Sequence, residues 1–168
     1  MNEGAEKTRE RITQPDQVLY RPIARAYVSE GVVAPDAFLL NSNDRADSNR
    51  LSVTRGSVAT AEDAYNERAA TLKAGCEKRG APYRPPVGVL GVTVEEVESV
   101  EIKSPDGSEA RRPLSAWDDS MNEDVPDTHG HIDYNGVPFS EKGAHLNTAK
   151  ALLARAVDHG WKYGPIDE

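Results

Sequence analysis

The sequence predicts an α+β fold, a single small domain in which a mixed or mostly antiparallel sheet packs against two main helices, at about residues 61–79 and 140–159. Three observations lead to this fold class. Two segments carry helix start and stop signals, a strong hairpin signal lies between them, and the other apolar stretches have the length of strands. The resulting order of strands, helix, strands and helix is typical of an α+β domain.

We expect one domain at residues 17–164, preceded by a flexible lead at 1–16 and followed by a short tail at 165–168. A chain of 168 residues is long enough to bury one core. Its 38% hydrophobic content and mean hydropathy of −0.64 leave little apolar material beyond that core. The first sixteen residues are polar and lack periodicity, which is typical of a disordered segment.

Both helices are predicted from the residues at their ends. The first follows Thr60-Ala-Glu-Asp63, which has the form of a capping box, and stops before Gly80 and Pro82. The second is expected to have Ser140 as its N-cap and to stop at Gly160. Its apolar stripe consists of Leu146, Ala149, Leu153, Ala156 and Val157. This stripe must pack on the sheet or on the first helix.

Two segments are the best candidates for strands of the sheet. The segment 50–55 places Leu51 and Val53 on one face, as a half-buried strand requires. The segment 87–92 is short and continuously apolar, which predicts a strand buried on both faces.

A β-hairpin is expected between residues 99 and 114, because Ser104-Pro-Asp-Gly-Ser contains the Asp-Gly pair that suits a tight turn. Just before it, Thr93-Val-Glu-Glu96 repeats the capping pattern and predicts a single helical turn. The turn-forming residues at 41–49 predict a surface loop.

The formal charge of −8, from 20 basic and 28 acidic residues, narrows the range of partners. Non-specific affinity for nucleic acid depends on Lys and Arg side chains that neutralise phosphates, so the composition argues against generic DNA binding. An acidic surface is better suited to a basic protein partner.

The single cysteine, Cys76, excludes an intrachain disulfide and a zinc site of several thiolates within one chain. We interpret it as a small buried side chain. The N-terminal segment has no apolar core of the kind found in secretory signals, and no run approaches the roughly 18 apolar residues of a membrane span. We therefore expect a cytoplasmic protein that does not enter a membrane.

The segment Asp127-Thr-His-Gly-His-Ile-Asp133 is the leading site candidate. If it forms a strand, its alternation places Asp127, His129, His131 and Asp133 on one face, with the two histidines about 6.5 Å apart along the backbone. Gly130 is the weak point of this hypothesis, because a glycine inside a strand can mark a bulge that would break the shared face.

One interpretation of the segment is a divalent metal site. Asp127, His129, His131 and His145 are the candidate ligands, and Asp133 or the acidic pair Asp118-Asp119 are alternatives for the third position. Nitrogen and oxygen ligands of this kind suit zinc, manganese or iron. A coordinated water with a lowered pKa would then support hydrolysis.

A second interpretation is acid-base chemistry without a metal. His129 and His131 would act as acid and base with Asp133 orienting them, while Arg21 and Arg50 would bind an anionic group of the substrate. The third interpretation is structural, in which these side chains form the solvated face of an edge strand.

The sequence therefore leads to two hypotheses of function. The first is a small hydrolase or nuclease-like enzyme that uses the His-x-His strand with help from an aspartate, with or without a metal, on a small-molecule or nucleotide substrate. The alternative is a non-enzymatic accessory or interaction domain whose acidic surface binds a basic protein partner.

Overall fold

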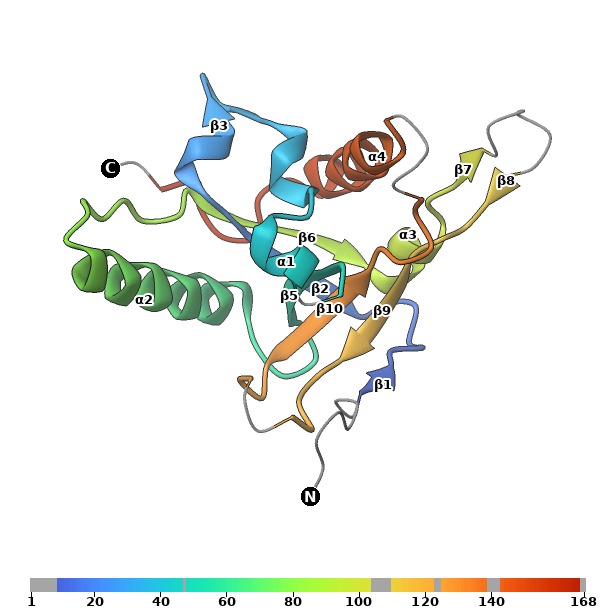
Figure 1. The fold of residues 1–168 in the computed structure, drawn as a ribbon, viewed down its shortest axis with the longest axis horizontal. Helices are drawn as coiled ribbons and strands as arrows, with labels where there is room; N and C mark the ends of the chain where they lie inside the picture. The colour runs from blue at the N-terminus through green and yellow to red at the C-terminus, as the bar shows by residue number, and fades with distance from the viewer. Residues whose placement is uncertain (1–8, 47, 104–109, 123–124, 139–142, 167–168) are drawn as a thin grey trace.

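The computed structural model describes residues 9–46, 48–103, 110–122, 125–138 and 143–166. Within these residues it contains a six-stranded antiparallel sheet and four helices, two of them long, which confirms the predicted α+β class (Figure 1). The sheet consists, in spatial order, of β1 (Glu10–Arg11), β9 (Ser115–Asp118), β10 (His129–Asp133), β5 (Arg50–Arg55), β2 (Val18–Ile23) and β6 (Gly88–Thr93).

In the described residues, the remaining elements are two short β-ribbons, the helices and two 3-10 turns. Two short ribbons pair β3 (Val28–Ser29) with β4 (Val32–Val33) and β7 (Ile102–Lys103) with β8 (Ala110–Arg111). The helices are α1 (Ser42–Ala46), α2 (Ala61–Arg79), α3 (Val94–Glu98) and α4 (Ala144–His159), with 3-10 turns at Arg25–Tyr27 and Pro35–Phe38. No helix in the described ranges has the length and apolarity needed to cross a membrane.

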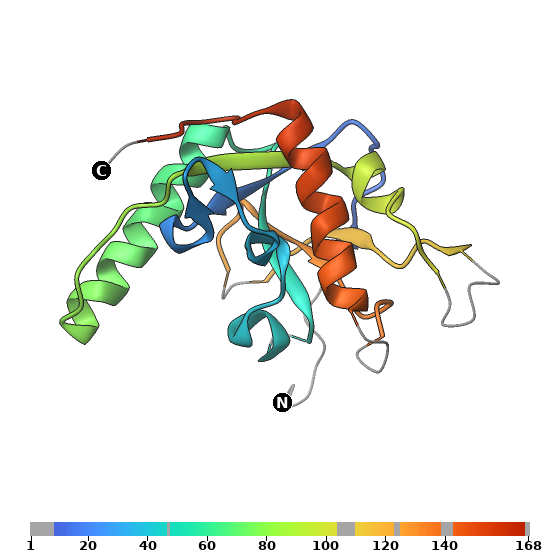
Figure 2. The same ribbon diagram turned by 90° about the horizontal axis from the view of Figure 1, so that it is seen from above.

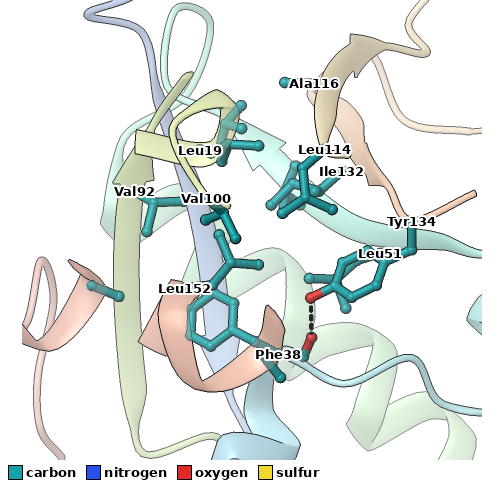
Figure 3. Packing of buried hydrophobic residues seen from close by; sticks show 14 of the residues in the cluster. Leu19, Phe38, Leu51, Val92, Val100, Leu114, Ala116, Ile132, Tyr134 and Leu152 are labelled. Atoms are coloured by element: carbon teal, nitrogen blue, oxygen red, sulfur yellow. Dashed lines mark hydrogen bonds between the residues drawn. The ribbon is translucent and has the colours of Figure 1, made fainter. Parts of the chain in front are cut away.

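The main core lies between one face of the sheet and α4. Leu51, Val53 and Ile132 reach it from the central strands, and Leu152 reaches it from α4. Figure 3 shows Leu51, Ile132 and Leu152 in this core, together with the Tyr134 hydroxyl that donates a 2.6 Å hydrogen bond to the carbonyl oxygen of Phe38. The buried phenol is thereby satisfied, as a polar group in an apolar core must be.

Helix α2 packs on the other face of the sheet. Ala61, Ala64 and Tyr65 form a second, smaller core with Val89 of β6. In Figures 1 and 2, β6 runs between the two long helices. Because α4 packs on one side of β6 and α2 on the other, the strand is apolar from Gly88 to Val92, as its sequence predicted.

The first long helix matches its prediction closely. Thr60 Oγ1 accepts from the Asp63 amide and the Asp63 carboxylate accepts from the Thr60 amide, so the capping box is complete. Gly80 ends the helix with a φ of 66°, a left-handed conformation that glycine adopts at little cost. The second capping pattern is also confirmed, with Thr93 as the N-cap of α3.

The second long helix begins later than predicted. Its first residue is Ala144, and the N-cap is Gly143, which provides no side-chain cap. The predicted N-cap, Ser140, lies outside the described residues. The prediction relied on a serine followed by helix formers, which is only a local signal, whereas the observed N-cap is a glycine that has no side chain to mark the start.

Three further predictions, of a hairpin, a surface loop and a flexible N-terminal segment, can be compared with the structure. The hairpin is confirmed in its arms, β7 and β8, while its predicted turn at 104–109 falls outside the described residues. The expected loop at 41–49 contains the short helix α1. Within the segment expected to be a flexible lead, β1 pairs with β9 and Ile12 is buried in the core.

A C-terminal segment covers the outer edge of β6. Val89 donates a hydrogen bond to the Tyr163 carbonyl, at 2.9 Å, and accepts one from the Lys162 amide, at 2.8 Å. The antiparallel bridge between Val89 and Tyr163 therefore extends the sheet by one residue pair beyond β6.

Truncation of Leu152 tests the packing of α4. Leu152 is fully buried, so we expect Leu152→Ala to lower the free energy of unfolding by about 2–5 kcal/mol through lost burial and the cavity that remains. Urea denaturation followed by circular dichroism measures this loss. Leu146, on the same helix but 39% exposed, is the matched control, and Leu146→Ala should cost less than about 1 kcal/mol. Equal losses in the two variants would contradict the described face of α4.

Candidate functional site

Strand β10 carries both histidines of the candidate site on one face. It pairs with β5 and β9 in continuous antiparallel register, in which His131 lies opposite Ser52 and Trp117. The ladder passes through Gly130 without a bulge. His129 and His131 therefore point to the face opposite the core that Ile132 enters.

Gly130 is needed because another side chain crosses it. A Cβ at this position would lie 2.8 Å from the Trp117 carbonyl oxygen and 2.9 Å from Cγ of Arg55, closer than real contacts allow. The Arg55 side chain lies over the glycine, forms a 3.1 Å ion pair with Asp118 and donates to the Asp127 carbonyl. Glycine at position 130 thus makes room for a buried arginine on the core side of the histidine strand.

Asp119 joins the two histidines. It follows β9 directly, and its amide donates to the His129 carbonyl at 3.2 Å, which places its side chain on the histidine face. Oδ2 lies 2.9 Å from Nδ1 of His129 and 2.8 Å from Nδ1 of His131. The side chains of Asp119 and His131 are only 7% and 1% exposed.

These contacts determine where the histidine protons lie. An ionised carboxylate can only accept hydrogen bonds, so Nδ1 of both His129 and His131 must carry a hydrogen that is donated to Asp119. In the neutral ring the other nitrogen, Nε2, is then an acceptor. A carboxylate that fixes the tautomer in this way also orients the ring.

The environment of Asp119 favours its charged form. Burial alone would raise the pKa of the carboxyl group, but the hydrogen bonds that His129 and His131 donate, together with the charge that either ring carries when protonated, outweigh burial and lower the pKa well below its ordinary value. Nε of Arg9 adds a weaker ionic contact at 3.6 Å. The site is therefore built around a buried carboxylate that stays ionised at neutral pH.

Ser52 completes a chain of three side chains. It lies on β5, and its hydroxyl oxygen is 2.8 Å from Nε2 of His129. Because Nε2 of the neutral ring is an acceptor, the Ser52 hydroxyl donates to it. Ser52, His129 and Asp119 therefore have the connectivity of a nucleophile, a general base and a group that orients the base.

A cavity of about 360 Å³ lies beside this pair, lined by Ser52 and His129 and by residues of β2 and α2. It forms where β2 and β5 diverge, since these strands pair only at Leu19–Arg55 and Tyr20–Thr54. Arg21 bridges the gap by donating to the Ser52 carbonyl at 2.8 Å and to the Ala37 carbonyl at 2.9 Å. A positive charge thus lies next to the main chain of Ser52.

The other predicted site residues lie elsewhere. Asp127 precedes β10 and is exposed. Asp133 is at the far end of the strand, where its carboxylate accepts from the Asn135 amide. His145 contacts the Val137 carbonyl and the Tyr134 ring on the core side of the sheet, so it cannot reach His129. Arg21 lines the cavity, whereas Arg50 does not.

The ligand-type side chains that do come together are Asp119, His129 and His131. Within the described residues, no three His, Cys, Asp or Glu side chains are arranged to hold a metal ion. In this cluster both Nδ1 atoms are already bonded to the carboxylate. Nε2 of His131 is buried without a hydrogen-bond partner and the ring stacks on Trp117, with centroids 6.4 Å apart. Metal binding by Asp127, His129, His131 and His145 stays a prediction.

Ser52 was not among the site residues predicted from the sequence. Asp119 was among the alternatives for a third ligand, because it lies in an acidic loop close in sequence to the histidines. Ser52 is 77 residues away from His129, and only the pairing of β5 with β10 brings the two together. The alternation of Leu51 and Val53 toward the core did place Ser52 on the opposite face.

Comparisons with known proteins identify no relative: no protein-family model, no curated protein and no solved structure matches this chain.

Replacement of Asp119 by asparagine tests the buried carboxylate. We expect Asp119→Asn to lower the free energy of unfolding at pH 7 by about 2–3 kcal/mol, the scale of hydrogen bonds to a charged group. Because folding lowers the pKa of Asp119, the stability that the carboxylate contributes is present above the ordinary value of 3.8 and is lost as the pH falls below it. The gap between wild type and variant, measured by urea denaturation at pH 7, 5 and 3, should shrink at pH 3.

The control for this measurement is Asp158→Asn, which makes the same chemical change at an exposed position of α4. It should leave the unfolding free energy within about 0.5 kcal/mol of wild type at pH 7. A gap between wild type and Asp119→Asn that stays constant or widens at pH 3 would contradict the lowered pKa.

Proposed function

We propose that this chain is a small hydrolase that cleaves esters or related acyl compounds by nucleophilic catalysis, with Ser52 as nucleophile, His129 as general base and Asp119 as the residue that orients the base. The observation that carries this proposal is the continuous chain of contacts from the Ser52 hydroxyl to Nε2 of His129, at 2.8 Å, and from Nδ1 of His129 to Asp119, at 2.9 Å. Both distances are within the range expected for a nucleophile and its base.

The reaction would proceed in two stages. Ser52 Oγ attacks the substrate carbonyl carbon while its proton passes to Nε2 of His129. The tetrahedral intermediate then expels the alcohol, which takes that proton and leaves an ester on Ser52. In the second stage His129 accepts a proton from water, the resulting hydroxide attacks this ester, and the proton returns to Ser52 Oγ as the carboxylic acid is released.

Two features of the cavity support this chemistry. The Arg21 guanidinium lies against the Ser52 main chain, so its charge favours the oxyanion that develops beside the nucleophile. His129 is 20% exposed on its side chain, whereas Asp119 is 7% exposed. The base is thus accessible to substrate while its partner carboxylate is shielded from water, where its interaction is stronger.

Several features expected from the sequence remain part of this proposal as predictions. The His-x-His strand supplies the base, and Asp119 takes the role that was expected of Asp133. A divalent metal is not needed for this mechanism. A cytoplasmic location stays an expectation.

Chemical labelling and kinetics test the nucleophile. A fluorophosphonate probe should label the wild-type chain at Ser52, and peptide mass spectrometry should locate the adduct. Ser52→Ala and His129→Ala should both lose labelling and should slow hydrolysis of p-nitrophenyl butyrate by at least about a thousandfold, because the nucleophile and base act as one unit. Circular dichroism spectra verify that each variant is folded.

Ser29→Ala is the matched control, since Ser29 is exposed on β3 and does not line the cavity. It should retain both labelling and activity. Labelling at another serine, or a hydrolysis rate that Ser52→Ala leaves unchanged, would overturn the proposal. Absence of both labelling and hydrolysis in the wild-type chain would favour the alternative class, a non-enzymatic domain that binds a basic protein through its acidic surface.

A further inference from the structure

Arg68 projects from α2 toward the cavity that holds Ser52 and His129. Ala64, Arg68 and Leu72 all line this cavity and are spaced by four residues, so they form one face of the helix. Arg68 is exposed, which places its guanidinium where a ligand can reach it. Among the described residues it takes part in no hydrogen bond or ion pair.

The other charged groups of the cavity have contacts within the protein. Arg21 donates to two carbonyl groups. Asp44 accepts from the Asn41 amide at 3.0 Å, and Glu67 accepts from the Thr128 hydroxyl at 2.9 Å. Among the described residues that line this cavity, Arg68 is therefore the charged group whose side chain has no hydrogen bond or ion pair within the protein and can bind a ligand.

We propose that Arg68 is a specificity-determining residue that binds a carboxylate on the acyl group of the substrate, so that the site prefers acidic esters to neutral esters of the same length. This inference rests on the proposed function, because it assigns the second end of a substrate whose first end reacts with Ser52. An arginine is suited to this role, since its planar guanidinium can hold both oxygens of a carboxylate.

The charge of the whole chain makes a local cation important for such a substrate. With a formal charge of −8, the protein repels an anion at long range. Arg68 and Arg21 lie close enough to interact with one another, and together they provide positive charge within the cavity. Burial also lowers the pKa of Arg21, with a smaller contribution from Arg68. The cavity, at about 360 Å³, is at the small end of ligand pockets and fits a short acyl chain.

The first experiment compares two esters that differ in one group. p-Nitrophenyl hexanoate ends in a methyl group, and mono-p-nitrophenyl adipate ends in a carboxylate at the same position. Wild type should hydrolyse the adipate ester with a lower KM than the hexanoate ester, and Arg68→Gln should raise the KM for the adipate ester about tenfold while changing the KM for the hexanoate ester much less. Added salt should weaken the adipate reaction of wild type and leave that of the variant unaffected.

Lys73→Gln is the matched control. Lys73 is exposed on the same helix, does not line the cavity and loses the same charge in the variant. It should retain the preference for the adipate ester. A loss of preference in Lys73→Gln equal to that in Arg68→Gln would overturn the proposal, because the effect would then come from net charge alone.

The second experiment measures binding without catalysis. Isothermal titration of adipate into Ser52→Ala should give a Kd that rises about tenfold when Arg68→Gln is added to that chain. Because no nucleophile is present, this result separates the two proposals. If adipate binding depends on Arg68 but the wild-type chain hydrolyses neither ester, the hydrolase proposal is overturned and the anion site is supported. Adipate binding that is undetectable, or unchanged by Arg68→Gln, would overturn the anion site even if Ser52 reacts with a fluorophosphonate.

Discussion

The alternation of side chains along β5 and β10 is the constraint on which both the core and the candidate site depend. On one face, Leu51, Val53 and Ile132 fill the space beneath α4; on the other, Ser52 and His129 meet at the cavity. A slip of one residue in either strand would exchange the two sets. The core therefore fixes the register, and the register fixes the distance between the hydroxyl and the imidazole. The residues that stabilise the core therefore also set the geometry of the candidate site.

The parts of the fold that follow from short-range signals were predictable. The capping boxes at Thr60 and Thr93 determine where α2 and α3 begin, because they satisfy amides that would otherwise lack partners. The start of α4 was wrong, since no comparable side-chain cap exists at Gly143. The order of the strands was beyond prediction as well. It depends on pairings between segments as distant as β1 and β9, which no local pattern records.

The same division applies to the site. Histidines two residues apart share a face by alternation, and Asp119 is near them in sequence, so this half could be anticipated. His145 could not be excluded from the sequence, because its position on the core side depends on how α4 crosses the sheet. Ser52 could not be included, because a serine in a strand is ordinary until a partner strand brings a base within hydrogen-bond distance. The side chain that the proposed function makes the nucleophile thus had the weakest signal in the sequence.

The C-terminal segment over β6 also bears on how the protein behaves at high concentration. An apolar strand with an open edge is a template for pairing with another chain, and β6 is the most apolar strand of this sheet. The bridge between Val89 and Tyr163 occupies the main-chain groups that an intruding strand would need first. Residues 162–166 therefore cover the edge of β6 and hinder its pairing with a strand of another chain. Loosening of this segment would expose the edge of β6, and it would also disturb the cavity, because Tyr163 and Ile166 pack in the same cluster as Ala64, which lines it.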